Sequence, residues 1–314
     1  MQSKMAIQFK KSIFTSLAHQ RLLVCRNCRS ITSLIDASSC AICSKELSLH
    51  SLTDYMSILN KPRGQAEVLF IGCFVLLSII AATDLLQLLI SIGMGIVSLV
   101  VILLIRAKYR TELMLMQLQK ILLKKQNLID RGLENDFQRA LEEIKIGHYK
   151  QAYEILREIG YFKHNDTIRN YKIDCLNRFV LRTDMELELD SLVPSEYNLQ
   201  FIIYLYEVSK VNKQLIRRPT LDYVMEHREA IEALAFGPEL IANICSATLR
   251  MRSYVDLYQL LIIDYMDKLP RERFLRLVKM IAANTEYDWT EITSRASQIV
   301  HSKYDYDPEF KGII

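Results

Sequence analysis

Four of the seven cysteines fall in two C-x2-C pairs, Cys25 with Cys28 and Cys40 with Cys43, and eleven residues separate the pairs. Two such pairs offer four thiolates to one tetrahedral Zn²⁺ ion. Each short spacing lets a tight turn aim both sulfurs at the same point. Four sulfur ligands leave no open coordination position, so we predict one structural zinc site and no catalytic metal.

Other uses of these cysteines need a different context. Paired disulfides need an oxidising compartment, and a redox C-x-x-C motif normally lies near a βαβ pattern, which the sequence lacks. His50 follows the second pair and could replace one ligand, although a surface histidine is the simpler interpretation. We therefore favour zinc.

The residues around the cysteines predict two short strands, Arg21–Val24 and Ser30–Ile35, with a return turn at Asp36–Ser39. About residues 20–50 thus resemble a short zinc ribbon. The resemblance implies a small antiparallel sheet around the metal and implies no particular function. A segment of this size cannot bury a sufficient core alone, so the metal would also stabilise the fold.

A long apolar stretch, Val68–Ile105, contains a single charged residue, Asp84. A helix needs about 20 apolar residues to cross a bilayer. The stretch therefore predicts a transmembrane hairpin at 65–105, with crossings at 66–82 and 85–105 and a turn at Asp84. A hairpin that enters only one leaflet is the alternative, and it would bury Asp84 at high cost.

Basic residues flank this stretch on both sides. Residues 1–65 carry nine Lys or Arg against three acids, and residues 106–125 carry six against one. The bias predicts a multi-pass membrane protein with both termini in the cytoplasm and membrane lipids as partners. A loose resemblance to bacterial inner-membrane proteins with an N-terminal zinc ribbon favours a bacterial cell membrane. The acid-free residues 1–24 also permit a mitochondrial transit peptide or a lipid-surface helix.

The remainder is predicted to be helical, and the expected fold class is mainly α. The domains would be 1–64 with the ribbon, the hairpin 65–105, a juxtamembrane helix 106–132 that breaks at Arg131–Gly132, a helical repeat domain 133–303 and a tail 304–314. Residues 137–160 resemble one tetratricopeptide-type helix pair, which implies a solenoid. The later helices are expected at 166–182, 196–211, 221–235 with Thr220 as N-cap, 239–251, 254–268, 271–284 and 289–301.

No catalytic motif is present: the sequence has no P-loop, no G-x-S-x-G and no H-E-x-x-H. We therefore predict a scaffold or adaptor, not an enzyme, that binds partner proteins through its helical domain. Residues 126–314 carry an acidic surplus, so nucleic acid is not the expected partner. Two alternatives are a regulator that binds nucleic acid through Arg21, Arg26 and Arg29, and a membrane-shaping hairpin. The oligomeric state is left open.

Overall fold

The computed structural model describes residues 4–13, 15, 17–34, 39–40, 42–46 and 49–52, separate positions and the run 92–98 between 72 and 120, and residues 122–284 and 286–313. The chain divides into two compact units. Unit 1 combines Met1–Ser12 with Glu143–Ile314, and unit 2 is Ile13–Glu142.

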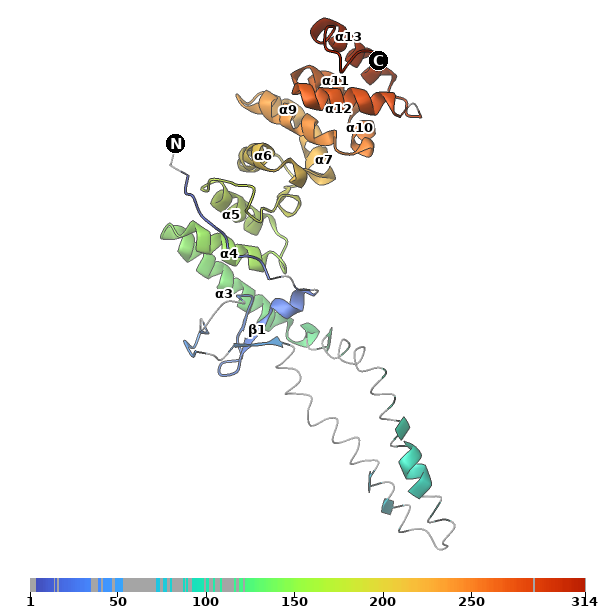
Figure 1. Ribbon diagram of the computed structural model, residues 1–314. Coiled ribbons are helices and arrows are strands. Elements are labelled where there is room, and N and C mark those ends of the chain that lie inside the picture. The colour runs from blue at the N-terminus through green and yellow to red at the C-terminus, as the bar shows by residue number, and fades with distance from the viewer. Residues whose placement is uncertain are drawn as a thin grey trace. The chain divides into compact units, whose positions relative to one another are not determined.

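Unit 2 contains a three-stranded antiparallel sheet with the order β2-β1-β3. Figure 1 labels its central strand, β1. The strands are β1 (Leu23–Cys25), β2 (Ile31–Thr32) and β3 (Leu49–Ser51), and the short helix η1 (Ala18–Arg21) precedes β1. Leu23 pairs with both Thr32 and Ser51. The strands predicted at Arg21–Val24 and Ser30–Ile35 are therefore present but shorter, since Arg21 ends η1 and β2 covers only two residues, and β3 was not predicted. Residues 35–38, which include most of the predicted return turn, lie outside the described residues.

The helix α3 (Gln126–Lys145) contacts β2 and the following Ser33 through Gly132 and Asp136. It runs straight through Arg131 and Gly132, so the predicted helix break there is wrong. The glycine is there because α3 and β2 approach closely at this point: a Cβ atom on Gly132 would overlap the backbone oxygen of Ile31. This glycine makes room for a strand and does not end the helix.

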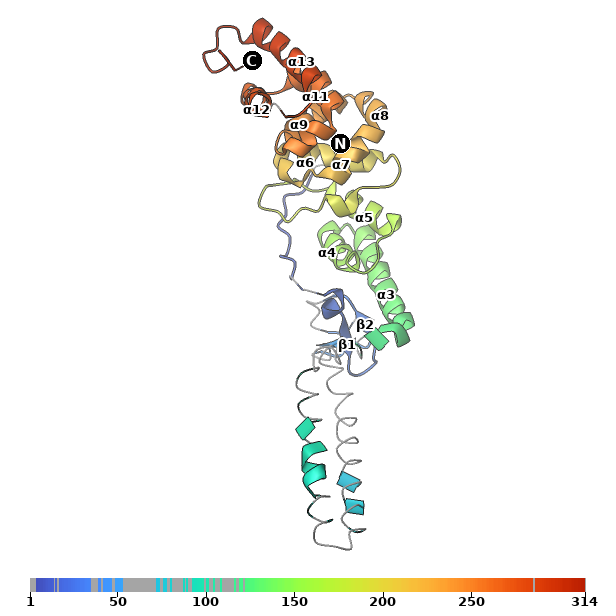
Figure 2. The same ribbon diagram turned by 90° about the vertical axis from the view of Figure 1, so that its right-hand side faces the viewer.

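Unit 1 is helical, and its helices follow one another through the unit (Figures 1 and 2). Their bounds are α4 (Tyr149–Ile159), α5 (Asp166–Leu176), η2 (Asp190–Leu192), α6 (Leu199–Val211), η3 (Lys213–Leu215), α7 (Arg218–Glu226), α8 (Arg228–Glu232), α9 (Gly237–Thr248), α10 (Arg252–Leu257), α11 (Gln259–Tyr265), η4 (Met266–Lys268), α12 (Arg271–Ala282) and α13 (Thr290–Lys303).

Helices of unit 1 pack on near neighbours in the chain: α4 on α5, α5 on α6, α6 on α9, and α11 on both α9 and α13. Large buried side chains such as Tyr153, Tyr204, Phe201 and Phe274 fill the space between them. The apolar spacing predicted most of these helices because one face of each is buried in this core.

Several helix boundaries differ from the prediction, and each of the predicted helices 221–235 and 254–268 is divided into two, α7 with α8 and α10 with α11. α7 begins at Arg218, with Pro219 in its first turn, so Thr220 is a buried helical residue and not the N-cap. α5 ends at Leu176, six residues before the predicted end. The residues that follow are irregular because they pair with the N-terminus of the chain, as described below.

The transmembrane prediction needs a correction. A crossing helix needs about 20 consecutive apolar residues, and no helix among the described residues is both long enough and apolar enough to cross a membrane. The predicted hairpin at 65–105, and with it the multi-pass membrane location, is therefore wrong for the part of the chain that the structure describes. The other residues of that hairpin, Asp84 among them, lie outside the described residues.

Candidate functional site

The two cysteine pairs form two turns of the same design. In the first turn the amide of Arg29 donates to the oxygen of Cys25 at 2.9 Å, and in the second the amide of Ser44 donates to the oxygen of Cys40 at 2.8 Å. Arg29 and Ser44 each follow the second cysteine of a pair, and both have positive φ, 59° and 53°. The matching backbone folds both turns so that their sulfurs point to one centre.

The four predicted ligand sulfurs meet in one cluster. The Sγ atoms of Cys25, Cys28, Cys40 and Cys43 all lie within 4.8 Å of one another. Cys25 Sγ lies 3.6 Å from Cys43 Sγ, and Cys28 Sγ lies 3.5 Å from Cys40 Sγ. A tetrahedral zinc with bonds of about 2.3 Å separates its sulfurs by about 3.8 Å. The cluster could therefore hold one metal ion with little movement.

Burial and hydrogen bonds act in opposite directions on two of these sulfurs. Burial raises the pKa of the Cys28 thiol to about 11. Burial acts in the same direction on Cys40, but hydrogen bonds from the Ser30 hydroxyl and from the amides of Cys43 and Ile42 outweigh it and lower the pKa of that thiol. Amide groups aimed at a sulfur favour the thiolate, which is the form that binds a metal.

The basic residues near the cysteines do not share one role. Arg21 is buried, and its Nε donates to Thr15 Oγ1 at 2.9 Å, while a terminal nitrogen donates to the oxygen of Ile13. Arg26 and Arg29 are exposed. His50 lies on β3 and is not a member of the described metal cluster. One of the three arginines considered for nucleic acid binding is thus part of the fold.

A buried carboxylate ties α3 to the sheet of unit 2. Asp136 accepts hydrogen bonds from the amide and hydroxyl of Ser33 at 2.8 and 2.9 Å, and from the Thr32 hydroxyl at 2.9 Å. Burial raises the pKa of this carboxyl, and these hydrogen bonds act against that rise. The contact lies one helical turn after Gly132, so both residues hold β2 against the same face of α3.

In unit 1 the N-terminal segment, residues 4–12, lies along the helices in an extended conformation (Figure 2). Met5 forms a parallel bridge with Phe179: its amide donates to the oxygen of Arg178, and its oxygen accepts from the amide of Val180, both at 2.9 Å. The segment therefore pairs with the irregular chain after α5 as a strand would.

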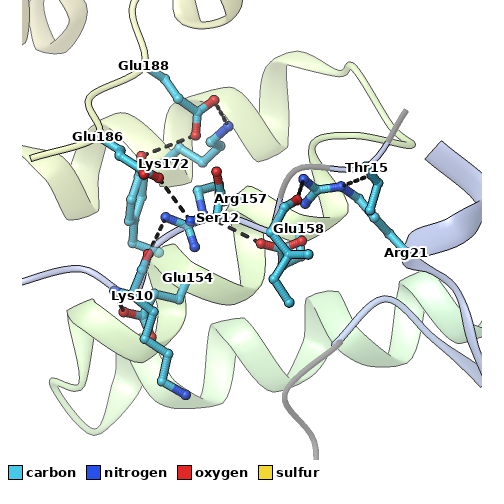
Figure 3. Close-up of polar contacts among 12 residues, drawn as sticks. Lys10, Ser12, Thr15, Arg21, Glu154, Arg157, Glu158, Lys172, Glu186 and Glu188 are labelled. Atoms are coloured by element: carbon cyan, nitrogen blue, oxygen red, sulfur yellow. Dashed lines mark hydrogen bonds and ion pairs between the residues drawn. The ribbon is translucent and has the colours of Figure 1, made fainter. Parts of the chain in front are cut away.

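Further along, charged side chains bind the backbone of the N-terminal segment (Figure 3). Glu154 accepts from the amide of Lys10 at 3.0 Å, and the buried Arg157 donates to the oxygen of the same residue at 3.0 Å. Glu186 accepts from the amide of Ser12 at 2.9 Å, and this bond is the main reason why the pKa of that carboxyl is lowered.

One side chain anchors the segment. Phe9 is 9% exposed, and its ring centre lies 4.7 Å from that of Tyr153 and 5.6 Å from that of Phe179. At the start of the segment Lys4 forms an ion pair with Glu207 at 3.1 Å. We call the residues that hold the N-terminal segment the docking surface: Tyr153, Glu154, Arg157, Arg178–Val180, Glu186 and Glu207.

Glu188 fixes the irregular chain that carries part of the docking surface. Its carboxylate accepts from Lys172 Nζ at 2.6 Å and from the Tyr153 hydroxyl at 3.1 Å, and its backbone oxygen accepts from the Tyr204 hydroxyl at 2.6 Å. Burial, with the nearby carboxylate, raises the pKa of both tyrosines. Side chains from three helices therefore hold the loop at Glu188 without the N-terminal segment, whereas Arg178 and Val180 pair with that segment.

Sequence reasoning missed the docking surface, although it identified the four cysteines. The cysteines can be recognised by their spacing in the sequence. Phe9, in contrast, is more than 140 residues away in the chain from each of its aromatic partners. A local signal did exist, since residues 4–12 contain three lysines, one phenylalanine and no acid.

A comparison of the chain with protein-family models, with curated proteins and with solved structures finds no match.

Proposed function

We propose that this protein is a scaffold that binds partner proteins through the helical unit 1, with unit 2 stabilised by one structural zinc ion. The observation that carries the proposal is the docking surface, where helical residues hold an extended segment mainly by its backbone. A surface that recognises a backbone and one anchor side chain is suited to binding segments of other proteins.

The metal part of the proposal rests on the donor set. Four cysteine sulfurs in two matching turns suit the soft, tetrahedral coordination of Zn²⁺. Four ligands would leave no position for a substrate, so Cys25, Cys28, Cys40 and Cys43 would hold zinc for stability and not for catalysis. Elemental analysis of the purified full chain should give one zinc per chain. The paired change Cys25→Ser and Cys40→Ser should give none.

Quantitative affinity purification with the full chain as bait tests the scaffold function. We compare the wild type with Glu186→Lys on the docking surface and with Glu229→Lys, which makes the same charge change at an exposed position of α8. We expect one defined set of proteins with the wild type and with Glu229→Lys, and at least a tenfold loss with Glu186→Lys. No defined enrichment by any bait would contradict the scaffold function.

A further inference from the structure

We propose that the docking surface is a binding site for an extended basic segment of a partner protein, and that the N-terminal segment occupies this site in competition with the partner. The inference rests on the proposed scaffold function and specifies its partner. It follows from three properties of the contacts: what they recognise, what charge they carry, and how the site is built.

The contacts prescribe the shape of the occupant. Amides at the positions of Met5, Lys10 and Ser12 must donate hydrogen bonds, so none of these positions can be proline. The position of Phe9 must carry a large ring, because it packs between Tyr153 and Phe179. The side chain of Gln8 is exposed and places no demand on the partner.

The contacts also prescribe the charge of the occupant. Glu154, Glu186 and Glu207 all face the N-terminal segment, which itself carries three lysines and no acid. The buried Arg157 donates to the backbone oxygen of Lys10 and forms an ion pair with Glu158 at 3.6 Å, so a carboxylate already lies beside its charge. A suitable partner segment thus carries a basic residue five positions before an aromatic residue and further basic residues after it.

Part of the site is built independently of its present occupant. The Glu188 network, which links α4, α5 and α6, forms without any residue of the N-terminal segment. The chain between Ser12 and Glu143 belongs to unit 2, so the segment reaches the site as a tethered ligand. A tethered ligand competes at an effective concentration on the order of mM. The segment therefore masks the site until a partner segment displaces it.

The test measures fluorescence anisotropy of a labelled peptide with the sequence of residues 1–13, titrated with the full chain. Phe9→Ala in the full chain removes the anchor of the tethered segment and leaves the docking surface intact. We expect this variant to bind the peptide at least tenfold more tightly than the wild type does. The matched control Gln8→Ala should bind the peptide as weakly as the wild type.

Two further peptides define specificity. A peptide with Phe9→Ala and a peptide with Lys10→Pro should each lose at least tenfold in affinity for the Phe9→Ala chain. Absence of peptide binding to a Phe9→Ala chain that keeps its wild-type circular dichroism spectrum would overturn the proposal. A wild-type dimer that dissociates on Phe9→Ala would also overturn it, since a second copy would then be the occupant.

Failure of this proposal and failure of the scaffold function give different results. Peptide binding without any captured protein would support this site and count against the scaffold. Captured proteins that are retained at saturating peptide would support the scaffold and exclude this surface as their site.

Discussion

At the scale of single residues, Asp136 shows how a buried charge holds two elements together. Its carboxylate has no basic partner within hydrogen-bonding distance among the described contacts, and it is satisfied by an amide and two hydroxyl groups. Such a group contributes little when all its bonds are made, but leaves costly unpaired donors when it is removed. Its role is thus to fix the position of β2 on α3.

We expect Asp136→Ala to destabilise this contact by about 1–3 kcal/mol, because the buried donors of Ser33 lose their acceptor. Hydrogen exchange of the amides of β1 and β2 measures the effect, which corresponds to at least about a fivefold faster exchange. Asn135→Ala, at the exposed neighbouring position, is the control and should leave exchange unchanged. Equal exchange in both variants would show that the carboxylate does not hold the strand.

Ser44 is the second residue whose effect can be predicted. Its positive φ costs an L-residue about 1–2 kcal/mol, a cost that glycine avoids and a β-branched residue increases. We therefore expect Ser44→Gly to keep or raise zinc affinity and Ser44→Val to lower it at least tenfold. Competition with a coloured chelator measures both. Equal zinc affinities for Ser44→Val and Ser44→Gly would contradict the positive φ assigned to this position.

At the scale of elements, α3 can approach β2 closely because Gly132 has no side chain. A Cβ atom at Gly132 would overlap a backbone oxygen, which cannot move aside as a flexible side chain can. Gly132→Ala should therefore destabilise unit 2 by about 1–3 kcal/mol, although alanine is the better helix former. Thermal unfolding followed by far-UV circular dichroism tests this. A raised unfolding temperature would contradict the close approach.

Elements that depend on local signals could be predicted from the sequence. The four cysteines, the strands beside them and most helices follow from spacing within about 20 residues. The end of α5 could not be predicted in this way. Residues 177–182 have helical periodicity, but Arg178 and Val180 form hydrogen bonds with Met5, which is more than 170 residues away in the chain. Tertiary pairing therefore overrides the local pattern there.

The same contrast applies to the sites. Spacing alone identified the candidate metal ligands, because a metal site needs few residues at fixed intervals. The docking surface combines residues from helix α4, from the loop that follows α5, and from helix α6. These residues do not recur at any regular spacing in the sequence. The long apolar stretch gave the opposite error, since composition predicted crossing helices that the described residues do not form.

At the scale of the whole molecule, the chain leaves unit 1 after Ser12 and returns to it at Glu143. The N-terminal segment is thus a ligand of unit 1 that the chain itself supplies. This arrangement makes partner binding conditional, since a partner must displace a tethered competitor. Loss of the anchor Phe9 should therefore increase partner capture and not reduce it.

Hydrogen exchange at the amide of Val180 tests this account most directly, because that amide donates to the oxygen of Met5. We predict that Phe9→Ala speeds its exchange at least tenfold in the full chain and that a saturating peptide of residues 1–13 restores the slow rate. Gln8→Ala should leave the rate unchanged. Exchange that stays slow in Phe9→Ala, or stays fast with the peptide present, would contradict the assignment of this surface as a binding site for extended segments.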